Sequence, residues 1–148
     1  MIRLRKSVVN ELQVFVEMEQ QSHAKRFINS DGLETHQKNF ADRNIIYLSI
    51  ENNDGELAGY FILASNPGDK LVEFRRVLID QSHRGLGQLA ITAMEIFCRD
   101  ELGCDRIWLD VYEDNAKGRH IYEKLGYRRF KEGSYQDRKL LYYHKDLR

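Results

Sequence analysis

Residues 71–97 read LVEFRRVLIDQSHRGLGQLAITAMEIF, and the pattern of apolar residues changes halfway along this stretch. Leu71–Asp80 has the residue content of a long strand. Ser82–Gly87 follows as a short loop with two glycines. Five apolar residues then recur at helical spacing: Leu89, Ala90, Ala93, Met94 and Phe97. The stretch therefore predicts a strand, a glycine loop and a helix that ends at Leu102-Gly103.

A strand that leads through a glycine loop into a helix creates a binding site for an anion. The first backbone N–H groups of a helix have no partner within it, and the helix dipole adds positive potential at the same place. Gly85 and Gly87 allow the backbone to approach a ligand closely, and Arg84 can contact a phosphate group. The alternative is that the two glycines only form a tight turn.

The rest of the chain alternates between further strands and helices. Strands are predicted at Ile2–Arg5, Ile45–Ile50, Leu57–Ala64, Arg106–Tyr112, Tyr127–Tyr135 and Lys139–Lys145. Helices are predicted after a cap at Asn10, at Leu33–Phe40 and at Ala116–Leu125. Antiparallel strands thus lead into one strand–helix–strand unit and a closing hairpin. We expect an α/β (α+β) fold with a mixed, mainly antiparallel sheet flanked by helices, in a single domain over residues 1–148.

Composition and charge argue against several classes of protein. The 148 residues include 23 Lys and Arg and 23 Asp and Glu, so the net charge is zero. A protein that binds nucleic acid mainly through phosphate contacts is expected to be basic, so this balance argues against such a partner. The longest stretch without a charged residue, Leu57–Gly68, is too short to cross a bilayer, and the N-terminus lacks the apolar run of a secretory signal. The two cysteines, Cys98 and Cys104, have no metal-ligand spacing. We therefore expect a cytoplasmic protein with no metal and no nucleic-acid or membrane partner.

Two blocks of the sequence resemble the GNAT superfamily of acyl-CoA-dependent N-acetyltransferases. The first, Ser82–Gly87, is similar to the family's cofactor signature Q/R-x-x-G-x-G/A, with Ser82 in place of Gln or Arg. The second, Asn115–Tyr127, is similar to N-x-x-A-x-x-x-Y-x-K-x-G-F, with Gly118 and Tyr127 as the departures. Because both blocks lie on the expected strand, loop and helix, the chain is identified as a member of this superfamily.

The resemblance implies a function, a cofactor and a set of binding residues. The function is transfer of an acetyl group from acetyl-CoA to a primary amine, on a small molecule or on a protein N-terminus or lysine, by direct attack in a ternary complex. Family members are often monomers or homodimers, and we expect one of these states. The loop residues expected to bind the pyrophosphate, mainly through backbone amides, are Ser82, His83, Arg84, Gly85, Leu86, Gly87 and Gln88.

The same resemblance assigns the pantetheine arm of the cofactor to two further places. The backbone of Val77, Leu78 and Ile79, at the end of the strand before the loop, is expected to pair with this arm. An amide of this stretch is also the expected donor to the oxyanion of the reaction. Asn115 is expected to hydrogen-bond the arm from the next motif, and its alternative role as a plain helix cap is compatible with that.

Two residues are candidates for the catalytic proton transfers. The resemblance places the proton donor for the departing thiolate at Tyr122, and a tyrosine suits this role because its pKa of about 10 lies near the value of about 8.5 for a thiol. The alternative is that Tyr122 only packs in the core. The resemblance also makes Glu73 the candidate general base, because several family members carry a glutamate there, and the alternative for it is a salt bridge to Arg75 or Arg76.

Two other functions are consistent with the same residues. Gly85, Gly87 and Ala90 also spell G-x-G-x-x-A, and Asp110 follows about 20 residues later, as in a dinucleotide-binding oxidoreductase. Against this, Asp80–Arg84 separates the strand from the first glycine, and only one strand–helix–strand unit is present. The other alternative is a non-catalytic module that binds acyl-CoA. Binding of NAD rather than CoA would favour the oxidoreductase.

Overall fold

The computed structural model describes residues 1–30, 32–66 and 68–148 of the chain. Within these residues, seven strands form one sheet in the order β1-β2-β3-β4-β5-β7-β6. The bounds are Arg3–Lys6 (β1), Ile45–Glu51 (β2), Leu57–Ser65 (β3), Leu71–Ile79 (β4), Arg106–Tyr112 (β5), Arg128–Tyr135 (β6) and Arg138–Asp146 (β7). Neighbouring strands are antiparallel except for β4 and β5, which are parallel. The expected mixed, mainly antiparallel sheet is confirmed.

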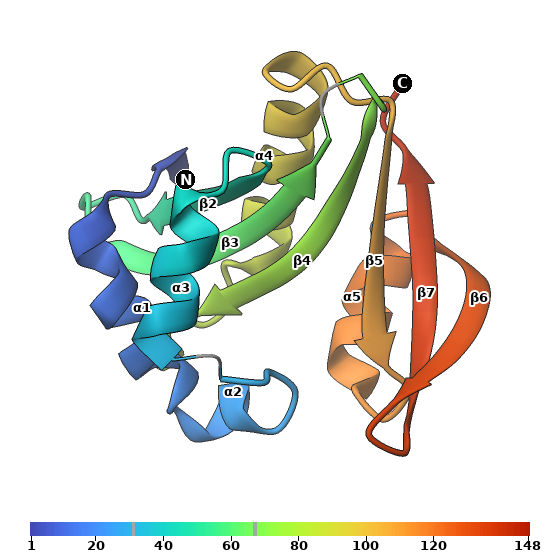
Figure 1. Cartoon of the computed structure of the whole chain (residues 1–148), viewed down its shortest axis with the longest axis horizontal. Helices are drawn as coiled ribbons and strands as arrows, with labels where there is room; N and C mark the ends of the chain where they lie inside the picture. The colour runs from blue at the N-terminus through green and yellow to red at the C-terminus, as the bar shows by residue number, and fades with distance from the viewer. Residues whose placement is uncertain (31, 67) are drawn as a thin grey trace.

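Helices cover both faces of this sheet (Figure 1). Their bounds are Leu12–Glu19 (α1), Ser22–Lys25 (α2), Gly32–Ala41 (α3), Gly87–Asp100 (α4) and Ala116–Lys124 (α5), with two 3-10 turns at Val9–Glu11 (η1) and Gln81–His83 (η2). The helices α1 to α3 lie on one face, and α4 and α5 lie on the other. The predicted helices are confirmed, whereas α2 escapes prediction because a single turn is too short to show a helical period.

Two apolar cores lie on opposite faces of the sheet. Strand β3 contributes to both of them, since Phe61 and Leu63 are buried in the larger core with α4, and Tyr60 and Ile62 in the smaller core with α1. A strand that is buried on both faces reads as a continuous apolar run, which is how Leu57–Ala64 appears in the sequence. The main cavity of the molecule lies beside these two cores, where the sheet divides into two arms.

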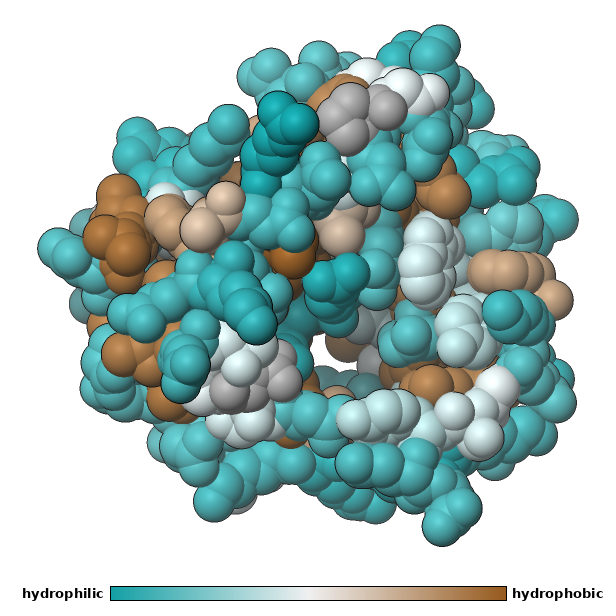
Figure 2. All heavy atoms as spheres, in the orientation of Figure 1, coloured by the Kyte–Doolittle hydropathy of each residue, from teal (hydrophilic) through white to brown (hydrophobic). Residues whose placement is uncertain are grey.

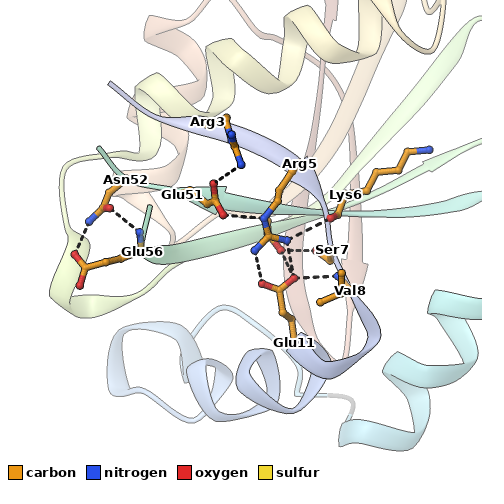
Figure 3. A network of polar contacts seen from close by, with 10 residues as sticks. Arg3, Arg5, Lys6, Ser7, Val8, Glu11, Glu51, Asn52 and Glu56 are labelled. Atoms are coloured by element: carbon orange, nitrogen blue, oxygen red, sulfur yellow. Dashed lines mark hydrogen bonds and ion pairs between the residues drawn. The ribbon is translucent and has the colours of Figure 1, made fainter. Parts of the chain in front are cut away.

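Strand β1 is tied to its neighbours by ion pairs, shown from close by in Figure 3. Arg5 binds the carboxylate of Glu11 through contacts of 3.0 and 2.8 Å and that of Glu51 through one of 2.8 Å. The same Glu11 carboxylate accepts the backbone N–H of Val8 at 3.0 Å, just before the first helical turn. The prediction of a cap at Asn10 is therefore wrong, because the turn begins earlier and Glu11 satisfies its leading amide.

Strands β4 and β5 separate soon after they meet. They pair only where Leu71–Glu73 lies beside Arg106–Trp108. Beyond this short ladder the two strands diverge, so that β1–β4 and β5–β7 form two arms joined at one end (Figure 1). Beyond the ladder the two strands leave inner backbone groups that no neighbouring strand pairs, and among these the carbonyl of Ile79 already accepts a hydrogen bond from His23 at 2.8 Å. The other inner groups can pair with a ligand that lies between the arms.

A β-bulge marks the place where β4 turns away from β5. On the neighbouring strand β3, Ile62 pairs with Arg76 and Leu63 pairs with Phe74, so Arg75 is an extra residue without a partner in the ladder. Bulges bend a strand and redirect its side chains. A regular strand was expected here, and the bulge bends β4 at the start of the opening.

The bulge also decides which way the two consecutive arginines point. Before it, Val72 and Phe74 are buried in the larger core, and beyond it Val77 packs against the same core. Without the extra residue, the strand alternation would bring residue 76 to that core instead. Arg75 and Arg76 therefore share the opposite face of the sheet, on the side of α1 to α3.

Strand β3 approaches β4 so closely at Gly59 that no other residue fits. A Cβ atom at Gly59 would lie 2.2 Å from the carbonyl oxygen of Leu78. Gly59→Ala is therefore expected to lower the free energy of unfolding by about 3 kcal/mol, because the backbone must shift. A matched change, Gly133→Ala in the edge strand β6, meets only the side chain of Tyr142, at 3.0 Å, and should cost less. Urea unfolding measures both, and an unchanged midpoint for Gly59→Ala would contradict this packing.

Candidate active site

A cavity of about 850 Å³ lies between the two arms. In the space-filling view the molecule is hollowed between the arms, and an opening lies near the middle of this face (Figure 2). The predicted site residues that line the cavity are Val77, Leu78, Ile79, Arg84, Gly85, Gly87, Gln88, Asn115 and Tyr122. The predicted residues absent from its lining are Glu73, Ser82, His83 and Leu86. The structure thus brings together residues from β4, α4 and α5 that are far apart in sequence.

The first turn of α4 presents free backbone amides to the cavity. Gly85 has a φ of +95°, a left-handed conformation that favours glycine, and it turns the chain into the helix. The N-cap residue Leu86 provides no capping side chain, and the first turn contains no acidic residue. The amide of Ala90 already binds the carbonyl of Leu86 at 2.9 Å, so the amides of the preceding residues have no helical partner. This arrangement suits an anionic ligand, such as a phosphate.

Three predicted loop residues shape the loop instead of lining the cavity. The carboxylate of Asp80 accepts the backbone N–H of Ser82 at 3.0 Å, the Ser82 hydroxyl, and the Gln21 amide at 2.6 Å. His83 lies 3.4 Å from the side chain of Asn52. Leu86 packs against the larger core. These contacts hold the loop from outside the cavity. The loop residues that line the cavity are Arg84, Gly85, Gly87 and Gln88.

Asn115 caps α5 and also faces the cavity. Its Oδ1 accepts the backbone N–H of Gly118 at 3.0 Å, while its Nδ2 has no hydrogen-bond partner among the described residues. A Cβ atom at Gly118 would lie 2.8 Å from that Nδ2, so a glycine leaves the amide undisturbed. From the same helix, Lys117 and His120 also line the cavity. The start of α5 thus offers a hydrogen-bond donor and basic side chains to a ligand.

The hydroxyl group of Tyr122 is available within the cavity. Its ring packs edge-on against Phe74 and Tyr127, each with a centroid distance of 5.8 Å. No described residue forms a hydrogen bond with this hydroxyl, whereas other buried tyrosines bind carboxylates: Tyr60 that of Glu19, Tyr127 that of Glu95 and Tyr143 that of Glu123. Burial, with a smaller contribution from the charge of Asp110, raises the pKa of Tyr122 to about 12. Tyr122 therefore stays protonated at neutral pH and can donate a proton.

Asp110 is the only acidic residue among the described residues that line the cavity. It lies on β5, on the face opposite to Ile107, Leu109 and Val111, which are buried in the larger core. Asp110 is exposed at the mouth of the cavity, but the atoms around its carboxyl group partly desolvate it, and this raises its pKa. The charge of Glu73 adds to this shift, and the charge of Arg75 opposes it. A carboxylate with a raised pKa is a better base than an ordinary aspartate.

Two carboxylates therefore differ in their suitability as a general base. The carboxylate of Glu73 accepts a hydrogen bond from Arg75 at 2.9 Å and lies outside the cavity lining, as in the alternative role considered for it above. As a functional residue, Asp110 enters the sequence analysis only through its spacing after Ala90 in the dinucleotide interpretation. The signal that identifies it is a lone carboxylate on the non-core face of the strand next to the cavity.

A buried polar network supports the wall of the cavity under α1 to α3. The fully buried carboxylate of Glu19 accepts hydrogen bonds from His36 at 2.8 Å, Arg76 at 2.8 Å, and Tyr60. Burial by itself would raise the pKa of Glu19, but these hydrogen bonds and the charge of Arg76 hold it below its usual range. Arg76 also donates to the carbonyl of Asn29 at 2.9 Å, and Asn29 lines the cavity. The network thus ties Asn29, in the segment after α2, to β4 at the cavity.

The fold does not support the dinucleotide-binding alternative. That fold needs a mainly parallel sheet made of repeated strand–helix–strand units. Here β4 and β5 are the one parallel pair among the described strands. In the part of the chain that the structure describes, no group of three or more His, Cys, Asp or Glu side chains is arranged to hold a metal ion. No helix described here is long and apolar enough to cross a membrane.

The chain is similar to a known protein family and to several solved structures. Residues 11–127 match the model of the acetyltransferase (GNAT) family. A spermidine N-acetyltransferase from Vibrio cholerae, solved with CoA and spermine, is 17% identical, with 99% of this chain and 95% of that chain covered and a TM-score of 0.85. A chimera of this enzyme with hSSAT is 18% identical over 99% and 95% of the chains, with a TM-score of 0.84.

A dodecameric form of the same Vibrio cholerae enzyme is 16% identical to this chain, with 99% of this chain and 94% of that chain covered and a TM-score of 0.81. No curated protein matches the chain. At this level of identity the solved structures agree with the fold, while the family match spans most of the sequence and includes both motif blocks. The chain therefore belongs to the acetyltransferase (GNAT) family, whose members transfer an acetyl group from acetyl-CoA to an amine.

Proposed function

We propose that the protein acetylates a primary amine by direct attack within the cavity between its two arms. The observation that carries the proposal is the placement of two groups in one cavity. Among the described residues, Tyr122 offers an unpartnered hydroxyl and Asp110 an unpaired carboxylate, and both line the same cavity as Gly87 at the start of α4. A proton donor, a proton acceptor and an anion site in one cavity are what acetyl transfer from a thioester requires.

The residues that line the cavity fit acetyl-CoA. The free amides at the start of α4 and the side chain of Arg84 would hold the pyrophosphate. The Nδ2 of Asn115 and the inner backbone edge of Val77–Ile79 would bind the pantetheine arm. When bound, acetyl-CoA supplies the acetyl group as an activated thioester. The separation of β4 from β5 leaves room for this arm between the strands.

The chain's own residues account for both proton transfers. Asp110 would accept a proton from the acceptor ammonium, which frees the amine's lone pair for attack on the carbonyl carbon. A backbone amide of Val77–Ile79 would donate to the carbonyl oxygen while charge develops on it. A carbon–nitrogen bond then forms, the carbon–sulfur bond breaks, and Tyr122 would donate its proton to the departing sulfur.

Binding of the cofactor is tested by thermal unfolding in the presence of acetyl-CoA, CoA or NAD. A ligand that binds only the folded protein should stabilise it by about 2.7 kcal/mol at a hundredfold excess over its dissociation constant. We expect a clear rise in Tm with acetyl-CoA and with CoA, and none with NAD. No shift with either CoA compound would contradict the assignment of the cofactor site.

A further inference from the structure

On the α1–α3 side of the cavity, the positive side chains have carboxylate partners, but one carboxylate has no positive partner among the described residues. We call this region, lined by Arg75, Arg76, Asp110 and Asn29, the acceptor side. Each arginine already has a carboxylate of its own: Arg75 binds Glu73 at 2.9 Å, and Arg76 binds the buried Glu19 at 2.8 Å. Asp110 has no hydrogen bond or ion pair with any described residue. Among the described lining residues, Asp110 is therefore the carboxylate that can pair with a cationic substrate.

The two arginines limit how many positive charges an acceptor can carry. The bulge in β4 directs both guanidinium groups to the acceptor side, and Arg75 interacts electrostatically with Asp110. One ammonium group can pair with Asp110. Among the described residues, a second ammonium group on the same molecule would lie near the arginines with no free carboxylate, and like charges at such a site are disfavoured.

Apart from His23, which hydrogen-bonds the carbonyl of Ile79 at 2.8 Å, most of the remaining walls of the acceptor side are apolar or aromatic. Phe27 and Ile28 line it from the segment after α2, and Tyr112, Tyr135 and Leu140 line it from the other arm. The ring of Tyr112 is covered by the guanidinium of Arg138 at 3.6 Å, so another cation on that face would compete with an existing one. These walls favour an uncharged, apolar body on the acceptor.

We infer that the acceptor is a monoamine, with one ammonium group that pairs with Asp110 on an otherwise uncharged, mainly apolar body. The inference rests on the proposed function and names the class of its substrate. It separates this chain from the structurally similar spermidine N-acetyltransferases, because a polyamine carries several ammonium groups along one chain.

The test compares butylamine with putrescine, which has the same carbon chain but a second terminal ammonium group. We expect kcat/KM for butylamine to exceed that for putrescine at least about tenfold, because the second charge meets the arginines. Arg75→Gln removes one of these charges and should bring the ratio closer to one. Arg106→Gln is the matched control, since Arg106 is exposed, binds Asp146 and lies outside the cavity lining, and it should leave the ratio unchanged.

The ratio in the wild-type protein decides the inference before any variant is made. Equal or better use of putrescine or spermidine would overturn it while leaving the proposed acetyl transfer intact. If neither amine releases CoA, the proposed function fails, and the relative affinity of the two amines for the CoA-bound protein then decides the monoamine inference. Weaker binding of putrescine would support it, and equal or tighter binding would overturn it.

Discussion

Tyr122→Phe is expected to lower kcat at least about a hundredfold, because the departing thiolate loses its proton donor. The affinity for acetyl-CoA should stay the same, since the ring keeps its contacts with Phe74 and Tyr127. Thiol release measures kcat, and a ligand titration measures the affinity. With a pKa of about 12, the Tyr122 hydroxyl should remain a proton donor well above neutral pH.

The matched control for this change is Tyr143→Phe. Tyr143 is a buried tyrosine whose hydroxyl binds Glu123 at 2.6 Å, away from the cavity. Its loss should lower stability and leave kcat near the wild-type value. A Tyr122→Phe protein with wild-type kcat would show that Tyr122 only packs in the core, which is the alternative that sequence reasoning leaves open.

Asp110→Asn is expected to lower kcat/KM about a hundredfold at neutral pH, because the general base is lost, and to raise the stability of the protein. The stability effect follows from the raised pKa of Asp110, which means that the folded state disfavours the charged carboxylate. The wild-type protein is therefore expected to be less stable than the variant at neutral pH. As the pH falls through the raised pKa toward the ordinary value of 3.8, this difference should disappear.

Urea unfolding of both proteins at neutral pH and at about pH 4 measures the stability difference, and initial rates measure the activity. Activity of the wild-type protein should rise with pH as Asp110 loses its proton. Glu73→Gln is the matched comparison, because Glu73 lies outside the cavity lining and pairs with Arg75. A larger loss of activity in Glu73→Gln than in Asp110→Asn would make Glu73 the base and would contradict the role proposed for Asp110.

Much of the fold is predictable because its signals are local. The apolar alternation of Arg106–Tyr112 and the continuous apolar run of Leu57–Ala64 both give strands at the expected places. The bulge at Arg75 is not predictable in this way, since it depends on how β4 pairs with β3. The only sign of it in the sequence is the pair Arg75-Arg76, two consecutive charged residues that break the alternation of the strand.

The residues of the site also differ in whether a local sequence signal identifies them. The motif blocks lead to Gly85, Gly87, Asn115 and Tyr122, and each of these lines the cavity. Asp110 belongs to neither of the two acetyltransferase motif blocks, and its place in the cavity is seen only when β5 is placed beside the opening. The network around Glu19 joins residues from α1, α3, β3 and β4, so no short stretch of sequence contains it.

The measurement to make first is transfer of the acetyl group itself. Purified protein is mixed with acetyl-CoA and butylamine, free CoA is followed as a new thiol, and the amine product is identified by mass. We predict that CoA appears in step with acetylated butylamine and that Tyr122→Phe abolishes most of this signal. Binding of acetyl-CoA without any acetylated product, from this amine or from a panel of other primary amines, would contradict catalysis and favour a module that only binds the cofactor.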